Sequence, residues 1–191
     1  RQLNEQSLTL EVCDLQDGDA RAAYKNVQFD VRTYKKLKMF VHAEAVENAA
    51  TQLNDDDVSL FVRLGTDFID NYYEYEIPLK TTAWGSTLDT EIWPEQNNIE
   101  IVFEKLLQLK LDRNAQIASG NGLVSYISEF ERLIPADLAN GINEVLIKVK
   151  GNPNLQGLKT VMVGVRNPHK NKHELENWNE DGLRKCANIW I

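Results

Sequence analysis

Alternation of apolar and polar side chains between residues 34 and 80 restricts the fold of this chain more than any other feature. The alternating runs cover residues 34–46 and 58–80, and a polar turn at 67–71 divides the second run. After that turn, Tyr73, Tyr75 and Ile77 alternate with two glutamates. A period of two residues with many β-branched and aromatic side chains is typical of strands whose two faces differ in surroundings. We therefore predict a meander of three antiparallel strands with one face buried against a second sheet.

Further alternating runs extend the predicted β structure along most of the chain. These predicted strands comprise residues 7–15, 26–32, 144–150, 158–166 and 186–191. The apolar spacing after Asn98 predicts one helix over about 98–108, although part of the same stretch also alternates. Segments 20–24 and 123–133 fit no single element, and 81–94 and 169–185 read as long polar loops. The sequence thus predicts a mainly β fold, a jelly-roll-like antiparallel β-sandwich with one short helix and long polar loops.

Size and charge exclude several classes of protein. The chain has 191 residues, which suits a single β-sandwich domain over 1–191, and we expect it to be a fragment of a much larger protein. Its net charge of −8 argues against nucleic acid as a partner, because phosphate binding needs clustered cations. The densest basic cluster, Lys35, Lys36 and Lys38, is flanked by acidic residues. No apolar run approaches the ~18 residues of a membrane-spanning helix, so we expect the domain itself not to span a membrane.

The two cysteines, Cys13 and Cys186, fall in the first and last predicted strands. Terminal strands of sandwiches often lie close together, so a disulfide between them is geometrically possible. Free Cys is also among the most buried residue types and packs as a small apolar side chain. We favour two separate, partly buried thiols.

The polar residues give no pattern that predicts an enzyme, a metal site or a cofactor site. His169 and His173 have the spacing of two ligands on one helical face, but a third ligand is missing nearby and we favour no metal. The acidic segment 54–57 lacks the spaced ligands and Gly of a calcium loop, so we favour a solvated turn there, and likewise at 17–19. Nucleophile elbows and phosphate-binding loops are also missing, and we expect a non-catalytic protein without a cofactor.

Five aromatic residues are the best candidates for a ligand or partner face. They are Tyr72, Tyr73, Tyr75, Trp84 and Trp93. Exposed rings on a sandwich could stack on sugars, which makes a carbohydrate-binding module with a concave sheet face the alternative function. We favour the simpler interpretation, in which alternate tyrosines belong to the core and the tryptophans fix the long loop over a sheet edge.

Several sequence blocks resemble the soluble domain of the SprA/Sov family. The blocks are TYKKLKMFVHAE (33–44), VRLGTDFIDNYYEYEIPL (62–79), EIWPE (91–95), KGNPNL (150–155), VMVGVRNP (161–168) and NIWI (188–191). They are long and distributed over most of the chain, so the resemblance concerns the domain as a whole.

The resemblance implies a role in gliding motility and type IX secretion. Members of the family are giant outer-membrane proteins, and the intact protein would be the protein-conducting translocon. This domain would then be an extramembrane insert at the outer membrane or cell surface, on a side that the sequence does not specify. Its expected partners are other parts of the translocon, outer-membrane accessory proteins and secreted polypeptide cargo. The resemblance carries over no active-site residue.

Overall fold

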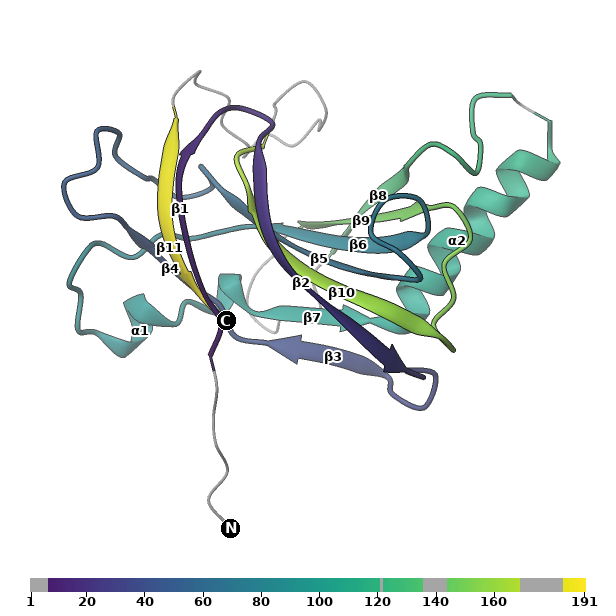
Figure 1. Ribbon diagram of the computed structural model, residues 1–191, viewed down its shortest axis with the longest axis horizontal. Helices are drawn as coiled ribbons and strands as arrows, with labels where there is room; N and C mark the ends of the chain where they lie inside the picture. The colour runs from purple at the N-terminus through teal and green to yellow at the C-terminus, as the bar shows by residue number, and fades with distance from the viewer. Residues whose placement is uncertain (1–6, 121, 136–143, 169–183) are drawn as a thin grey trace, which may run out of the picture.

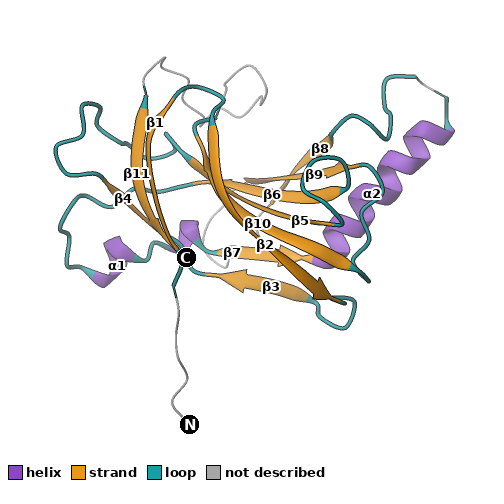
Figure 2. Cartoon of the chain, in the orientation of Figure 1, coloured by secondary structure: helices purple, strands orange, loops and turns teal. Residues whose placement is uncertain are grey.

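The computed structural model describes residues 7–120, 122–135, 144–168 and 184–191 (Figure 1). The strands are β1 Thr9–Leu15, β2 Ala20–Phe29, β3 Lys36–Met39, β4 His42–Ala45, β5 Ser59–Gly65, β6 Tyr72–Pro78, β7 Ile99–Val102, β8 Phe130–Pro135, β9 Glu144–Lys150, β10 Leu158–Arg166 and β11 Lys185–Trp190. The helices are α1 Asp89–Ile92, the 3-10 turn Glu95–Asn97 and α2 Phe103–Ala118. The predicted mainly β, antiparallel sandwich is confirmed (Figure 2). Among the described helices, none combines the length and apolar character needed to cross a membrane.

A six-stranded antiparallel sheet forms the larger layer, in the order β2-β10-β5-β6-β9-β8. The strands predicted over 58–80, 144–150 and 158–166 are its four central members, β5, β6, β9 and β10. Their alternation is confirmed. Tyr73 and Ile77 lie buried on one face of the sheet, and the residues paired with them on the neighbouring strands point to the same face. We call this apolar face the inner face.

Three smaller units cover the inner face. They are the sheet β1-β11-β4, the strand pair β3-β7 and helix α2, which lies against β8 and β9 (Figure 1). Side chains from all three units join one continuous apolar core with the large sheet, including Ala43, Ile99, Ile101, Leu106 and Ile189.

The predicted three-stranded meander is wrong in its first member. Residues 34–46 form two short strands in different sheets: β3 pairs with β7, and β4 pairs with β11. The side-chain alternation nevertheless holds, since Leu37 and Met39 on β3 and Ala43 on β4 all pack against the core. Periodicity is a local property that identifies the buried face, whereas the pairing partner is decided by residues distant in sequence.

The helix predicted over about 98–108 is displaced. Ile99 and Ile101 alternate inward on β7, and α2 begins only at Phe103 and continues to Ala118. The apolar pattern changes from a strand period to a helical period at Phe103, and Phe103, Leu106 and Leu109 continue it with the helical period.

Cys13 and Cys186 form a disulfide, so the preference for two free thiols is wrong. The cysteines belong to neighbouring antiparallel strands, and the pairing of Val12 with Ala187 brings Cys13 opposite Cys186. The bond joins residues 173 positions apart. Beyond it, the backbones of Leu8 and Ile191 exchange two hydrogen bonds of 3.0 and 2.9 Å. The disulfide therefore links the first and last described strands, β1 and β11, covalently.

The outer face of the large sheet carries a buried charge network. Arg63, Glu74 and Lys148 lie directly opposite one another on β5, β6 and β9. Lys148 Nζ lies 2.9 Å from Glu74 Oε1 and 3.2 Å from Glu76 Oε2, and both carboxylates are fully buried. Arg166, from β10, also contacts both glutamates. We call these five residues the charge network.

The network keeps Glu74 ionised inside the protein. Burial alone would raise the pKa of Glu74, but Lys148, Arg166 and Arg63 hold it well below its usual value. Burial opposes the charge of Arg166 in the same way, and the two glutamates reverse this effect and raise its pKa. Ser59 adds a hydrogen bond of 2.6 Å from its hydroxyl to Glu76. Each buried charge is thus compensated, which is the condition for tolerating it.

We predict that Glu74→Gln lowers the free energy of unfolding by about 3–5 kcal/mol, because it leaves three cations with one carboxylate. Urea unfolding monitored by circular dichroism measures this change. The matched control is Asp30→Asn, which removes an exposed ion pair with Arg32 and should change stability little.

The same variant should alter the pH dependence of stability. Because the folded-state pKa of Glu74 is lowered, its stabilisation is present above the pKa of an unfolded glutamate, about 4.3, and is lost as the pH falls below it. When the pH is lowered from about 6 to about 3, across this pKa of about 4.3, the free energy of unfolding of the wild-type protein should therefore fall more than that of Glu74→Gln. Parallel pH profiles of the two proteins would contradict the assignment.

We also predict that replacing both cysteines by serine costs about 2–5 kcal/mol of unfolding free energy, since the disulfide restricts a long loop of the unfolded chain. Chemical unfolding with and without a reductant measures the effect. Reductant should destabilise the wild-type protein and leave the double serine variant unchanged. Equal stability of the two proteins without reductant would show that the bond contributes nothing.

Candidate functional site

The five aromatic residues predicted as a ligand face are not brought together. Tyr73 and Tyr75 lie in the core on the inner face of the large sheet, as the simpler interpretation expected. Tyr72 faces the opposite way and is also buried, with the guanidinium of Arg63 3.8 Å from its ring centre. Burial raises the pKa of Tyr73 to about 12. None of the three tyrosine rings offers a surface on which a ligand could stack.

The two tryptophans remain accessible on the loop after β6. The exposed fractions of Trp84 and Trp93 are 52% and 48%. Trp93 lies 5.8 Å, between ring centres, from the imidazole of His42, which stacks on Trp190. Trp84 instead lines a hollow of about 620 Å³ that it shares with Asn54 and Asp55. The two tryptophans therefore belong to different surroundings.

The acidic segment predicted as a solvated turn is partly buried. Asp57 Oδ2 accepts hydrogen bonds from the backbone and side-chain N–H groups of Asn54 at 2.8 and 3.2 Å and lies 3.1 Å from Lys185 Nζ, so this oxygen is engaged within the protein. Across the described residues, no group of three or more His, Cys, Asp and Glu side chains is arranged to hold a metal ion. His169 and His173 lie outside the described residues.

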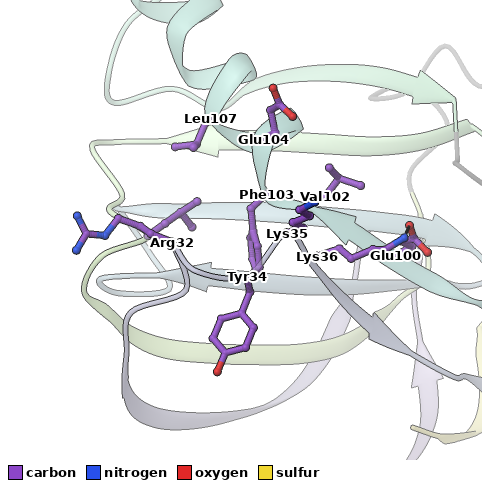
Figure 3. A pocket seen from close by; sticks show the side chains of 10 residues that line it. Arg32, Tyr34, Lys35, Lys36, Glu100, Val102, Phe103, Glu104 and Leu107 are labelled. Carbon is purple, nitrogen blue, oxygen red and sulfur yellow. Dashed lines mark hydrogen bonds and ion pairs between the residues drawn. The ribbon is translucent and has the colours of Figure 1, made fainter.

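A hollow lies around Tyr34, where the chain passes from β2 into β3 (Figure 3). It has a volume of about 550 Å³. Its lining consists of Arg32, Tyr34, Lys35, Lys36, Glu100, Val102, Phe103, Glu104, Leu107 and Leu155. We call it the Tyr34 groove. In Figure 3 the ring of Tyr34 points away from α2, which contributes Glu104 and Leu107 to the other side.

A second hollow adjoins the Tyr34 groove and shares Tyr34, Lys36 and Phe103 with it. It lies between β3 and the inner face of the large sheet and has a volume of about 440 Å³. Its lining is mainly apolar and comprises Phe29, Asp30, Val31, Tyr34, Lys36, Leu37, Met39, Leu64, Phe103, Leu158 and Val161. We call it the β3 hollow.

Charged side chains around both hollows are paired, with two exceptions. The Arg32 side chain holds Asp30 through three hydrogen bonds of 3.0, 3.2 and 2.7 Å and lowers the pKa of that carboxyl to about 2. Lys36 and Lys38 both contact Glu100, and they lower its pKa. In the part of the chain that the structure describes, Lys35 and Glu104 have no ion-pair partner. Both line the Tyr34 groove, so it presents one free cation and one free carboxylate.

The sequence did not identify this region as a site, although it contained a signal. That signal is the basic cluster at 35–38 together with the aromatic residues around it. Three aromatic residues, Phe29, Tyr34 and Phe40, surround that cluster, and all three are exposed in the structure. Large exposed apolar side chains beside cations are unusual on a protein surface and often indicate an interface.

Comparison with known proteins identifies the family. The chain matches the model of the SprA_N family, described as motility related/secretion protein, over residues 1–188. A search among curated proteins gave no match. Because the match covers nearly the whole chain, as the resemblance of the sequence blocks implied, this protein belongs to the SprA_N family of motility related/secretion proteins.

Proposed function

We propose that this chain is a non-catalytic, extramembrane interaction domain of an outer-membrane translocon that serves gliding motility and type IX secretion. Family membership supports a role in motility and secretion. Within that role the domain would bind other parts of the translocon, its outer-membrane accessory proteins or secreted polypeptide, and so take part in gating.

The observation that carries this proposal is the Tyr34 groove with the adjoining β3 hollow. Together they combine exposed aromatic rings, an apolar depression and a free lysine on one side of the molecule. Apolar and aromatic surface with a charged rim is the composition typical of protein interfaces. The described residues around it lack an arrangement of nucleophile, base and oxyanion donors, so binding is the function that the site supports best.

The disulfide supports a location outside the cytoplasm. Bonds such as Cys13–Cys186 form and persist in the bacterial periplasm and at cell surfaces, and they are rare where thiols are kept reduced. An extramembrane insert of an envelope protein would be in such an oxidising environment on either side of the outer membrane.

We predict that Tyr34→Ala combined with Lys35→Glu, introduced into the full-length protein, reduces both spreading motility and the amount of exported protein in the medium. The change removes an exposed ring and reverses the free charge of the groove without touching the core. Leu123→Ala is the matched control, because Leu123 is 88% exposed and does not line the groove. Normal motility and export with the double variant at wild-type abundance in the envelope would contradict the proposal.

A second candidate function, carbohydrate binding, has one observation in its favour. Trp84 is half exposed and lines a hollow beside polar side chains, an arrangement on which a sugar ring can stack. Calorimetric titration with envelope oligosaccharides tests it. Binding that is abolished by Trp84→Ala and retained by Trp93→Ala would favour this function over the first.

A further inference from the structure

Strand β3 has one edge without a partner strand. Its register with β7 pairs Leu37 with Ile101, and the Phe103 amide donates to the Lys35 carbonyl at 3.2 Å. Backbone groups alternate in direction along a strand, so those of residues 35, 37 and 39 face β7, whereas those of Lys36 and Lys38 face away from it. Among the described residues, β7 is the only strand paired with β3. The free edge thus offers the N–H and C=O groups of Lys36 and Lys38.

The large sheet extends beyond the layer that covers it at this same edge. β2 is an edge strand, and Ala23 is paired with the core residue Val163, which places Ala23, Val27 and Phe29 on the inner face. Yet Phe29 is 56% exposed, and Ala23 and Val27 are only partly buried. Phe29 lines the β3 hollow, together with residues of β10 and of β3. The inner face of the large sheet is therefore incompletely covered along β2.

The charges around the β3 hollow favour an acidic occupant. Asp30 is the one carboxylate in its described lining, and Arg32 already engages it. Lys35 directly precedes β3 and lines the adjoining Tyr34 groove, and Lys25 is paired with Val161, a lining residue on β10. In the described part of the chain, neither lysine has an ion-pair partner. This local positive excess contrasts with a net charge of −8 for the whole chain.

We propose that β3 accepts an extended polypeptide segment as an added strand, with alternate apolar side chains in the β3 hollow and acidic residues facing Lys25 and Lys35. Main-chain hydrogen bonds to Lys36 and Lys38 supply the strand pairing, and the hollow selects the side chains. This inference rests on the proposed interaction function and deepens it by naming the chemistry of the partner.

The test uses the purified 191-residue chain and a fluorescein-labelled peptide of sequence Glu-Thr-Val-Thr-Phe-Thr-Val-Glu. Fluorescence anisotropy measures its affinity for Lys36→Pro/Lys38→Pro and for Lys36→Ala/Lys38→Ala. Both variants lose the same contacts to Glu100, but only proline removes the outward N–H groups, and proline is tolerated where an edge N–H faces solvent. The loss of two hydrogen bonds should weaken binding by about tenfold or more relative to the alanine variant. Thermal unfolding verifies that both variants are folded.

Charge reversal tests the second part of the proposal. Lys35→Glu should weaken binding of the acidic peptide and strengthen binding of the same peptide with lysine at both ends. Equal affinities of the proline and alanine variants, or no saturable binding to the wild-type chain, would overturn strand addition. A dimer of the chain that the proline variant abolishes would also overturn it, by making a second copy the occupant.

The two proposals fail in different ways. If the peptide does not bind but Tyr34→Ala/Lys35→Glu still impairs motility and export, the interaction function stands without strand addition. If the peptide binds at β3 but that variant leaves motility and export normal, the strand site stands and the proposed function fails.

Discussion

Neutralisation of Glu74 and Glu76 by three cations is the interaction on which the large sheet depends. Both glutamates lie fully buried in the middle of β6, and Lys148 and Arg166 each contact both of them, so without these cations two carboxylates would be buried without compensation. The network also specifies register. A two-residue slip of β6 against β9 would keep Tyr73, Tyr75 and Ile77 on the inner face, so the apolar core alone discriminates weakly against it. The same slip would place Tyr72 opposite Lys148 in one direction and Glu76 in the other, so the network discriminates against the first of these registers.

The two faces of the large sheet therefore have different tasks. The outer face fixes the alignment of β10, β5, β6 and β9 through charges, while the inner face supplies the apolar floor of the β3 hollow through Leu64 and Val161. Both lining residues sit on strands anchored by the network, since Arg63 adjoins Leu64 and Arg166 ends β10. A binding surface on rigid strands is better preorganised than one on loops, and less ordering entropy is lost when a partner binds.

Sequence patterns predicted the parts of this structure that depend on local periodicity. The alternation of β5, β6, β9 and β10, the burial of Tyr73 and Tyr75 and the sandwich class all follow from which side chains share a face. Contacts between distant segments were not predictable in this way. The split of residues 34–46 between two sheets, the start of α2 at Phe103, and the Cys13–Cys186 bond each depend on a partner far along the chain. The Tyr34 groove was not predictable for the same reason, because its lining comes from the segment between β2 and β3, from β3, β7 and α2, and from Leu155.

Leu8 and Ile191 are hydrogen-bonded at the open end of the β1-β11 pair, so tension applied between these two residues would unzip the ladder one pair at a time. Four residue pairs, from Thr9–Trp190 to Val12–Ala187, lie between that end and the cysteines. After these pairs separate, the covalent bond carries the load, and the chain between Cys13 and Cys186 is shielded from it. A domain in a motility related protein would thereby keep the chain between its two cysteines folded under a pull that separates the outer pairs of β1 and β11.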